Sequence, residues 1–266
     1  MTVERFFSDM DGTLLGSNGD IPQYNIDVIK NIETPFSLVS ARAPMEMDFV
    51  INALHLEGPQ IGFNGGIIYE GTGDDRKVIQ QNYIQIDIVK NIIKNFSDNF
   101  PDVSLSLYDE NHWFAEKIDR GIELEKSITG QNPTVINFGN LLKKAVNVFK
   151  IMIIVFDEDT MQKLIQYFDG KNEKSVIVQR SGEQYLEITN KDAIKANGIK
   201  YVLETENVNP VNTYAFGDGH NDIPMFELVG HPVAMGNAMD EIKNYAEFIT
   251  SSNDEGGVGE FIKKMN

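Results

Sequence analysis

Short apolar runs alternate with amphipathic segments along the first part of the chain. The runs at 5–9, 36–39 and 61–63 have the length of buried strands. Between them Pro22 opens one helical segment and Pro44 another, because proline is favoured in the first turn of a helix. Strands that alternate with helices are typical of a parallel sheet covered on both faces. The pattern therefore predicts a doubly wound, Rossmann-like α/β fold.

The middle of the chain has a different pattern. An amphipathic helix is expected at 84–100, residues 103–108 alternate like a strand of an antiparallel sheet, and further strands are expected after residue 150. From about residue 193 the alternation of helix and strand resumes and continues to a last helix at about 257–265. We therefore expect a core domain formed by residues 1–81 and 189–266, and an inserted α+β cap domain formed by residues 82–188.

The composition allows one large domain or two modest ones, each with a hydrophobic core. The chain has 266 residues, of which 41% are apolar. The absence of cysteine excludes disulfides, thiolate metal sites and a cysteine nucleophile. Charged residues stand where a signal peptide would need its apolar region, and the longest apolar run, at 151–156, is too short to span a bilayer. These features predict a cytoplasmic protein.

The formal net charge of −17 limits the possible partners. Such a charge repels nucleic acid and anionic lipid, so we expect neither nucleic acid nor a membrane as a partner. A phosphorylated metabolite would be repelled as well. A site for such a ligand therefore needs local positive charge from a metal ion, a lysine or helix N-termini.

Polar residues gather where the expected strands of the parallel sheet end. In an open α/β sheet, ligands bind beyond the carboxyl ends of the strands, near the point where the strand order reverses. Carboxylates suit a hard divalent cation, whereas hydroxyl, amide and lysine groups suit an anion. The residues at these ends, and at the start of the helix after the insertion, are Asp9, Asp11, Ser40, Asp218, Asn221, Asp222, Lys191 and Lys195.

These side chains together suit phosphoryl transfer. A Mg²⁺ ion held by Asp9, Asp218 and a backbone carbonyl would screen a phosphate from the carboxylates. An aspartate oxygen could then attack phosphorus and form an aspartyl-phosphate. Asp11 could protonate the leaving alcohol and afterwards activate water. The phosphoryl oxygens would be stabilised by a hydroxyl, an amide and an ammonium group, those of Ser40, Asn221 and Lys195.

The order of these clusters resembles the four motifs of the haloacid dehalogenase superfamily of phosphatases. Residues 9–14 match the first motif, Asp-x-Asp-Gly-Thr-Leu, and residues 217–222 match the fourth. Residues 39–42 are similar to the second motif, although Ala41 replaces the usual glycine. Residues 187–195 are similar to the third, where Lys195 fits the spacing better than Lys191. The insertion follows an Asn-Gly-Gly turn, which resembles the Cof-like branch with a type IIB cap.

The resemblance implies a Mg²⁺-dependent phosphatase of small phosphomonoesters, such as sugar phosphates or phosphorylated cofactors. It implies that Asp9 is the nucleophile and a metal ligand, and that Asp11 is the acid/base and binds the metal through its backbone carbonyl. Asp218 is the implied third protein ligand, and Asp222 is implied in the outer metal shell. The residues implied to bind phosphate or substrate are Ser40, Arg42, Asn64, Gly65, Lys195 and Asn221.

Simpler interpretations exist for several of these residues. Asp-x-Asp-Gly also occurs in calcium loops, but the glycine of an EF-hand comes at position six and Gly12 is at position four. Asp222 could serve only as a helix cap. Three aromatic residues of the insertion fit either a substrate-stacking patch or the hydrophobic core of the cap; they are Tyr108, Trp113 and Phe114.

Two other functions remain compatible with the sequence. A phosphosugar mutase would form the same aspartyl-phosphate but pass it to a second hydroxyl. A non-catalytic metabolite-binding or signalling protein would keep the metal cluster, although Asp11 beside a long-lived aspartyl-phosphate argues against it. The sequence indicates neither the particular metabolite nor the oligomeric state.

Overall fold

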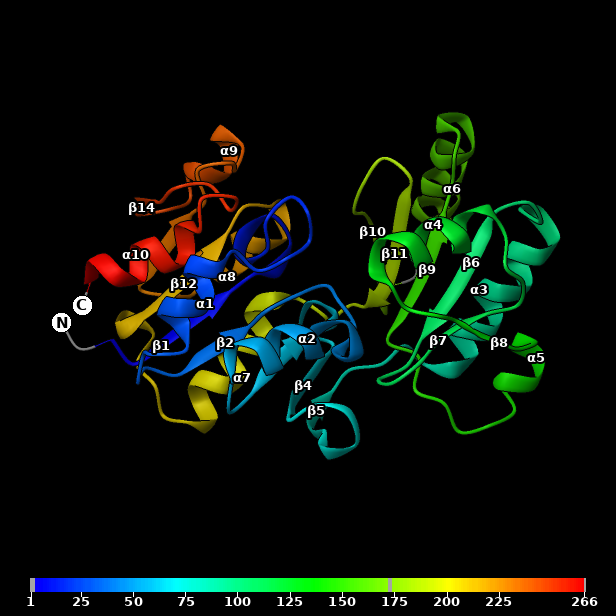
Figure 1. Ribbon diagram of the computed structural model, residues 1–266. Coiled ribbons are helices and arrows are strands. Elements are labelled where there is room, and N and C mark those ends of the chain that lie inside the picture. Colours follow the sequence, from blue (N-terminus) through cyan, green and yellow to red (C-terminus); the bar gives the residue numbers. More distant parts are fainter. Residues whose placement is uncertain (1–2, 172–173, 266) are drawn as a thin grey trace. The chain divides into compact units, whose positions relative to one another are not determined.

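The computed structural model describes residues 3–171 and 174–265, and the chain forms two compact units (Figure 1). The first unit comprises residues up to Arg42, Met47–Gln81 and the residues from Ile194. The second comprises Ala43–Glu46 and Asn82–Ala193. The chain thus leaves the first unit and returns to it, as an insertion requires.

A five-stranded parallel sheet forms the centre of the first unit. The central strand pairs on both sides in parallel register, with Phe7 opposite Ala215 on one side and Ser37 on the other. The fold-class prediction is therefore confirmed. In spatial order the strands are β14 (Phe248–Ile249), β13 (His231–Ala234), β12 (Thr213–Gly217), β1 (Arg5–Ser8) and β2 (Phe36–Leu38).

Helices cover both faces of this sheet because neighbouring side chains of a strand point to opposite faces. Phe7 packs in one hydrophobic cluster with Ile199, Met225 and Ile242. On the opposite face the ring of Phe6 lies 6.2 Å from that of Phe216, which in turn lies 5.6 Å from Phe261. The helices of the first face are α7 (Lys195–Thr205), α8 (Ile223–Phe226) and α9 (Asp240–Lys243); those of the second are α1 (Gln23–Ile29) and α10 (Gly257–Met265), which lie side by side in Figure 1.

The third expected strand does not extend the parallel sheet as the pattern predicts. The helix α2 (Pro44–Leu54) leads from β2 to β3 (Gln60–Gly62), and one parallel bridge, between Val39 and Ile61, links β3 to the residue that follows β2. On its other edge β3 pairs in antiparallel register with β4 (Ile67–Glu70), which pairs with β5 (Lys77–Gln81).

A six-stranded, mostly antiparallel sheet forms the second unit. One face carries its hydrophobic core, in which Phe96, Leu107 and Ile151 are buried. The strands in spatial order are β10 (Val176–Arg180), β11 (Tyr185–Asn190), β9 (Lys150–Ile154), β6 (Ser104–Tyr108), β7 (Trp113–Ala115) and β8 (Thr134–Val135). The helices are α3 (Ile86–Asn99), α4 (Arg120–Thr129), α5 (Phe138–Leu141) and α6 (Glu158–Lys171). The sequence pattern gave no prediction for α4, β8 and α5.

The aromatic residues of the insertion are buried in the structure. Tyr108 and Trp113 lie opposite each other on β6 and β7, with ring centroids 6.0 Å apart and nearly parallel planes. Phe114 points to the other face and joins the hydrophobic core. The core interpretation therefore holds for Phe114, whereas Tyr108 and Trp113 are buried on the other face of the sheet. Among the described residues, the structure has no helix that is long and apolar enough to cross a membrane.

The packing of α4 on the second sheet can be tested at Gly121. A β-carbon at this position would lie 2.5 Å from the β-carbon of Ser104 and 3.0 Å from that of Ile154. We expect Gly121→Ala to lower the free energy of unfolding by about 1–3 kcal/mol. Gly170 of α6 is the matched control, since nothing lies within 4 Å of its β-carbon position, and Gly170→Ala should raise stability by up to about 1 kcal/mol. Urea denaturation of both variants measures the difference; equal effects would contradict close packing at Gly121.

Candidate active site

The carboxyl end of the central strand β1 places Asp9 at the middle of the sheet. Its backbone N–H donates to the carbonyl of Phe216 at 2.9 Å, and its side chain is buried. The chain then makes a tight turn over Met10–Leu14, closed by the N–H of Leu15 and the carbonyl of Met10 at 2.8 Å. Asp9 is therefore held by sheet hydrogen bonds, and the turn carries the rest of the first motif.

Asp9 and Asp11 differ in their exposure. β1 ends at Ser8, so both residues lie beyond the strand, although the backbone of each is still extended. The side chain of Asp11 is 57% exposed, against 8% for Asp9. Both oxygens of Asp11 accept hydrogen bonds from Arg42, at 2.8 Å from Nε and 2.6 Å from Nη2. Asp11 and Arg42 thus form a separate ion pair at the rim of the site.

Lys195 occupies the centre of the site. Its side chain has no exposed surface, and its Nζ donates to Asp9 and, at 2.7 Å, to Asp222. It is the first residue of α7, and the preceding Ile194 is approached closely by the backbone of Gly65. Gly65 has a φ of +96°, and a β-carbon there would lie 2.5 Å from the Ile194 carbonyl oxygen. Only glycine allows this approach, so Gly65 helps to fix the start of α7.

Lys191, the other lysine considered from the sequence, lies in the second unit. Its side chain is 57% exposed, and its Nζ lies 3.6 Å from Asp192. The structure therefore identifies Lys195 as the lysine that meets the aspartates of the first unit.

Asp222 holds the loop that follows β12. One carboxylate oxygen accepts from the N–H groups of Asp218 and Gly219, each at 2.9 Å, and the other accepts from Lys195. A β-carbon at Gly217 would lie 2.6 Å from this carboxylate. Asp222 is fully buried, so its role is larger than that of a helix cap.

Asp218 faces the turn of the first motif. Its Oδ1 accepts from the hydroxyl of Thr13 at 2.8 Å, and a β-carbon at Gly12 would lie 2.8 Å from its carboxyl carbon. The glycine therefore leaves the space that the Asp218 carboxylate fills. The sequence analysis assigned no role to Thr13, although this residue lies inside the first motif. Its hydroxyl group was the feature that could have indicated a contact in the site.

Hydrogen bonds of the backbone and of the side chains link three residues expected to bind phosphate, Ser40, Asn64 and Asn221. Ser40 is buried, its Oγ accepts from the N–H of Arg42 at 3.1 Å, and its carbonyl accepts from the N–H of Asn64 at 2.8 Å. Asn64 adopts a left-handed conformation with a φ of +55°. Its side-chain oxygen accepts from Asn221 at 3.3 Å. The second and fourth motifs are therefore linked through Asn64.

Burial and charge set the protonation of the cluster. Burial raises the pKa of Asp9 well above its ordinary value, and Lys195 opposes this effect. Burial also raises the pKa of Asp218, to about 6. Burial would lower the pKa of Lys195, but Asp222 and Asp9 together raise it above its ordinary value. Lys195 is therefore charged at neutral pH and stabilises negative charge around it.

Three carboxylates of the cluster could share a cation. Asp9, Asp218 and Asp222 each offer an oxygen, and these oxygens lie within 4.8 Å of one another. Oxygen donors of this kind fit Mg²⁺. Asp222 already accepts three hydrogen bonds, whereas Asp218 accepts from Thr13 through one oxygen. The donor set therefore suits an ion held directly by Asp9 and Asp218, with Asp222 behind them.

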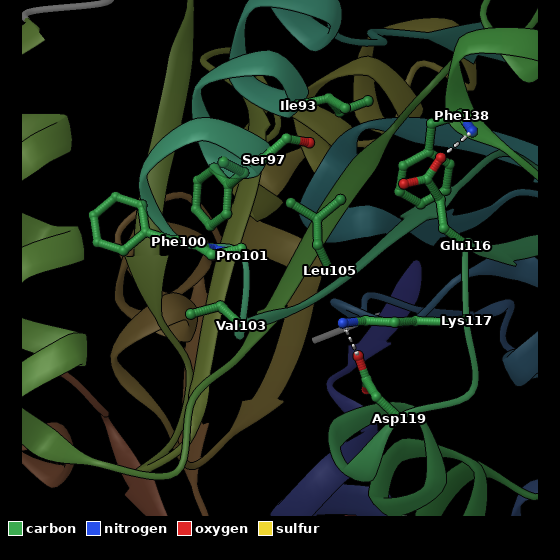
Figure 2. A pocket seen from close by; sticks show the side chains of 11 residues that line it. Ile93, Ser97, Phe100, Pro101, Val103, Leu105, Glu116, Lys117, Asp119 and Phe138 are labelled. Carbon is green, nitrogen blue, oxygen red and sulfur yellow. Dashed lines mark hydrogen bonds and ion pairs between the residues drawn. The ribbon is translucent and has the colours of Figure 1, made fainter.

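The pocket in Figure 2 belongs to the second unit and offers a different environment. It has a volume of about 210 Å³, and Phe96, Phe100 and Phe138 form the aromatic part of its wall. Its charged groups contact the protein itself: Glu116 accepts from the N–H of Phe138 at 2.7 Å, and Lys117 lies 3.9 Å from Asp119. We therefore place the chemistry in the first unit, where the site residues considered from the sequence, other than Lys191, lie.

Comparison with known proteins agrees with the geometry. A family model of haloacid dehalogenase-like hydrolases matches residues 6–262. The chain belongs to this family. The family prediction is thereby confirmed.

Relatives within the family share the whole length of the chain. It is 25% identical to a 5-amino-6-(5-phospho-D-ribitylamino)uracil phosphatase of Bacillus subtilis, with 97% of this chain and 96% of that protein covered. A haloacid dehalogenase-like hydrolase from Bacteroides thetaiotaomicron superimposes with a TM-score of 0.91 at 25% identity, over 100% of both chains. A sugar phosphatase of subclass IIB has the same fold, with a TM-score of 0.80 at 19% identity over 98% of each chain. These relatives support the prediction that the chain is a phosphatase.

The buried lysine yields a stability prediction. Lys195→Met would leave the Asp9 and Asp222 carboxylates buried without their counter-charge, and breaking such a pair costs about 3–5 kcal/mol. Losing the lysine raises the pKa of Asp9 further. A group whose pKa is higher in the folded than in the unfolded state stabilises the protein at low pH. This stabilisation is lost as the pH rises through the folded-state pKa. We therefore expect a larger loss of unfolding free energy at pH 8 than at pH 5, measured by urea denaturation in EDTA. Lys200→Met, on the exposed face of α7, is the control; an equal deficit at both pH values would contradict the prediction.

Proposed function

We propose that this hydrolase removes phosphate from small phosphomonoesters in a Mg²⁺-dependent reaction through an aspartyl-phosphate. The observation that carries the proposal is the buried cluster at the end of β1, where Asp9 meets Lys195 and shares a potential cation site with Asp218. A nucleophilic carboxylate, an ammonium group and a place for a cation are the groups that such a reaction needs.

The residues present fit Mg²⁺, with Asp9 and Asp218 as carboxylate ligands and Asp222 as their support. When bound, the ion would supply positive charge that lowers the repulsion between the phosphate and the carboxylates. Lys195 supplies positive charge from the protein itself. Ser40 and Asn221, which Asn64 links, are the proposed donors to the phosphoryl oxygens.

In the first proposed step, a carboxylate oxygen of Asp9 attacks phosphorus. The bond between phosphorus and the ester oxygen breaks, and the leaving alcohol takes a proton from Asp11. Arg42 contacts both oxygens of Asp11, so one of these hydrogen bonds must open while Asp11 carries the proton. The products of this step are the free alcohol and phosphorylated Asp9.

In the second step, water attacks the phosphorus of phosphorylated Asp9. Asp11 now takes a proton from the water, the bond between phosphorus and the Asp9 oxygen breaks, and inorganic phosphate leaves. Asp11 thereby regains the proton that it gave in the first step. The exposed position of Asp11 at the rim suits contact with both an alcohol and a water molecule.

The substrate class follows from the family rather than from a single residue. The relative from Bacillus subtilis is named for a phosphorylated ribitylamino-uracil, and the subclass IIB neighbour is named a sugar phosphatase. We infer that this protein also acts on a small phosphorylated metabolite. We further propose that the inserted unit is the cap that determines its specificity.

The proposed nucleophile, Asp9, can be tested by substitution. Asp9→Asn should lower the rate of p-nitrophenyl phosphate hydrolysis with Mg²⁺ by at least about a thousandfold, because the amide is a poor nucleophile. The exposed Asp27→Asn in α1 is the control and should keep the wild-type rate. Circular dichroism checks that both variants fold. A folded Asp9→Asn variant with the wild-type rate would refute the mechanism.

A measurement of released phosphate distinguishes the phosphatase from a mutase. Under multiple turnover a phosphatase releases one inorganic phosphate for each ester consumed. A mutase would instead convert one phosphosugar to another with little release. Tight metabolite binding without turnover of any ester in a broad panel would favour the binding-protein alternative.

The pKa of Asp218 predicts the pH dependence of metal binding. Burial raises this pKa to about 6, and only the ionised carboxylate binds a cation well. As the pH falls through 6, protons compete with Mg²⁺, so the affinity should decrease by about tenfold per pH unit or more. Isothermal titration calorimetry from pH 7.5 to pH 5 measures this trend. An affinity that stays constant over that range would rule out Asp218 as a ligand.

A further inference from the structure

Three asparagines hold the turn that carries Asp11. The side-chain amide of Asn237 donates to the carbonyl of Gly12 at 2.8 Å, that of Asn25 to Leu14 at 3.1 Å, and that of Asn253 to Leu15 at 2.9 Å. These carbonyls belong to three of the four residues that follow Asp11 in the sequence. The turn is therefore held from outside, by residues that belong to none of the four motifs.

Through these three asparagines the turn is linked to the C-terminal part of the chain. The side-chain oxygen of Asn237 accepts from the N–H of Asn253 at 2.9 Å, and that of Asn25 accepts from the N–H of Gly259 at 2.8 Å. Asn237 and Asn25 therefore each bridge two backbone groups. Next to them, Asp254 accepts from the N–H and the hydroxyl of Ser17, each at 2.7 Å.

Asn237 is the member of this set that contacts the residue next to Asp11. Gly12 is also the residue whose missing β-carbon makes room for the Asp218 carboxylate. A shift of the Gly12 carbonyl therefore moves Asp11 more directly than it moves Asp9, which is held by the sheet hydrogen bond to Phe216. Asn253 and Asn25 are buried, whereas Asn237 is exposed, so Asn237 can be changed with the smallest effect on folding.

We propose that Asn237 is a positioning residue for proton transfer by Asp11, held in turn by Asn253. It fixes the turn so that the Asp11 carboxylate stands where the ester oxygen leaves. This inference rests on the proposed function, because it assigns Asp11 the proton transfer. General acid catalysis contributes about 10²–10⁴-fold to rates, and a displacement of about 1 Å can cost about a hundredfold, so the effect is measurable.

The test uses two esters of similar shape whose leaving groups differ in basicity. p-Nitrophenol is a good leaving group that needs little protonation, whereas phenol needs more help from a general acid. For Asn237→Ala we expect kcat/KM to fall about tenfold or more with phenyl phosphate, and by less than about threefold with p-nitrophenyl phosphate. A merely structural disturbance would lower both rates by the same factor, and this outcome would overturn the proposal.

Asn237→Asp provides a second variant that keeps the acceptor for Asn253 but removes the donor to Gly12. Its added negative charge affects both esters alike. The fall in kcat/KM with phenyl phosphate, relative to that with p-nitrophenyl phosphate, should therefore match the relative fall caused by Asn237→Ala. Asn31→Ala is the matched control, since Asn31 donates one side-chain hydrogen bond to a backbone carbonyl, that of Asp27, away from the turn. Asn31→Ala should leave both rates unchanged.

The double variant with Asp11→Asn separates this proposal from the proposed function. Asp11→Asn alone should show the same selective loss with phenyl phosphate, and adding Asn237→Ala should then cause no further selective loss. If Asp11→Asn shows no such selectivity, the proposed role of Asp11 fails. If Asp11→Asn shows this selectivity but Asn237→Ala does not, only the positioning role of Asn237 fails.

Discussion

The ion pair of Lys195 with Asp9 and Asp222 is the interaction on which the rest of the site depends. The side chains of Lys195 and Asp222 have no exposed surface and that of Asp9 has 8%, and removing such charges from water costs several kcal/mol for each ion. The cost is offset only if every polar atom finds a partner. Asp222 meets this condition through the N–H groups of Asp218 and Gly219.

The dense packing around these charges explains the glycines near the site. Gly12, Gly65 and Gly217 lie in three different motifs or turns, yet a β-carbon at each would stand within 3 Å of a site carboxylate or of the backbone before Lys195. Two of them also adopt positive φ. Glycine is thus required where the backbone approaches the charged cluster, because a side chain would displace a site carboxylate or the backbone that precedes Lys195.

Much of this site can be predicted from the sequence because the carboxyl ends of parallel strands meet at one edge of a sheet. That rule brings Asp9, Ser40 and Asp218 together without knowledge of side-chain contacts. It does not decide between Lys191 and Lys195, since that choice depends on where α7 begins. It also does not predict the ion pair between Asp11 and Arg42, because both residues lie beyond the ends of their strands. Asn237 was missed because a single asparagine carries no periodic or motif signal.

The charge balance of the cluster gives an independent reason for a divalent cation. Within the described part of the chain, Lys195 is the one cation that pairs with the cluster of Asp9, Asp218 and Asp222, so the ionised carboxylates leave a formal charge of −2 in a largely buried site. Asp11 does not add to this charge, since Arg42 compensates it at the rim. A phosphate ester would bring further negative charge into the same low-dielectric region, where repulsion is strong. One divalent cation would cancel this excess, so the same negative charge that repels phosphate from the cluster would attract the ion that the proposed reaction needs.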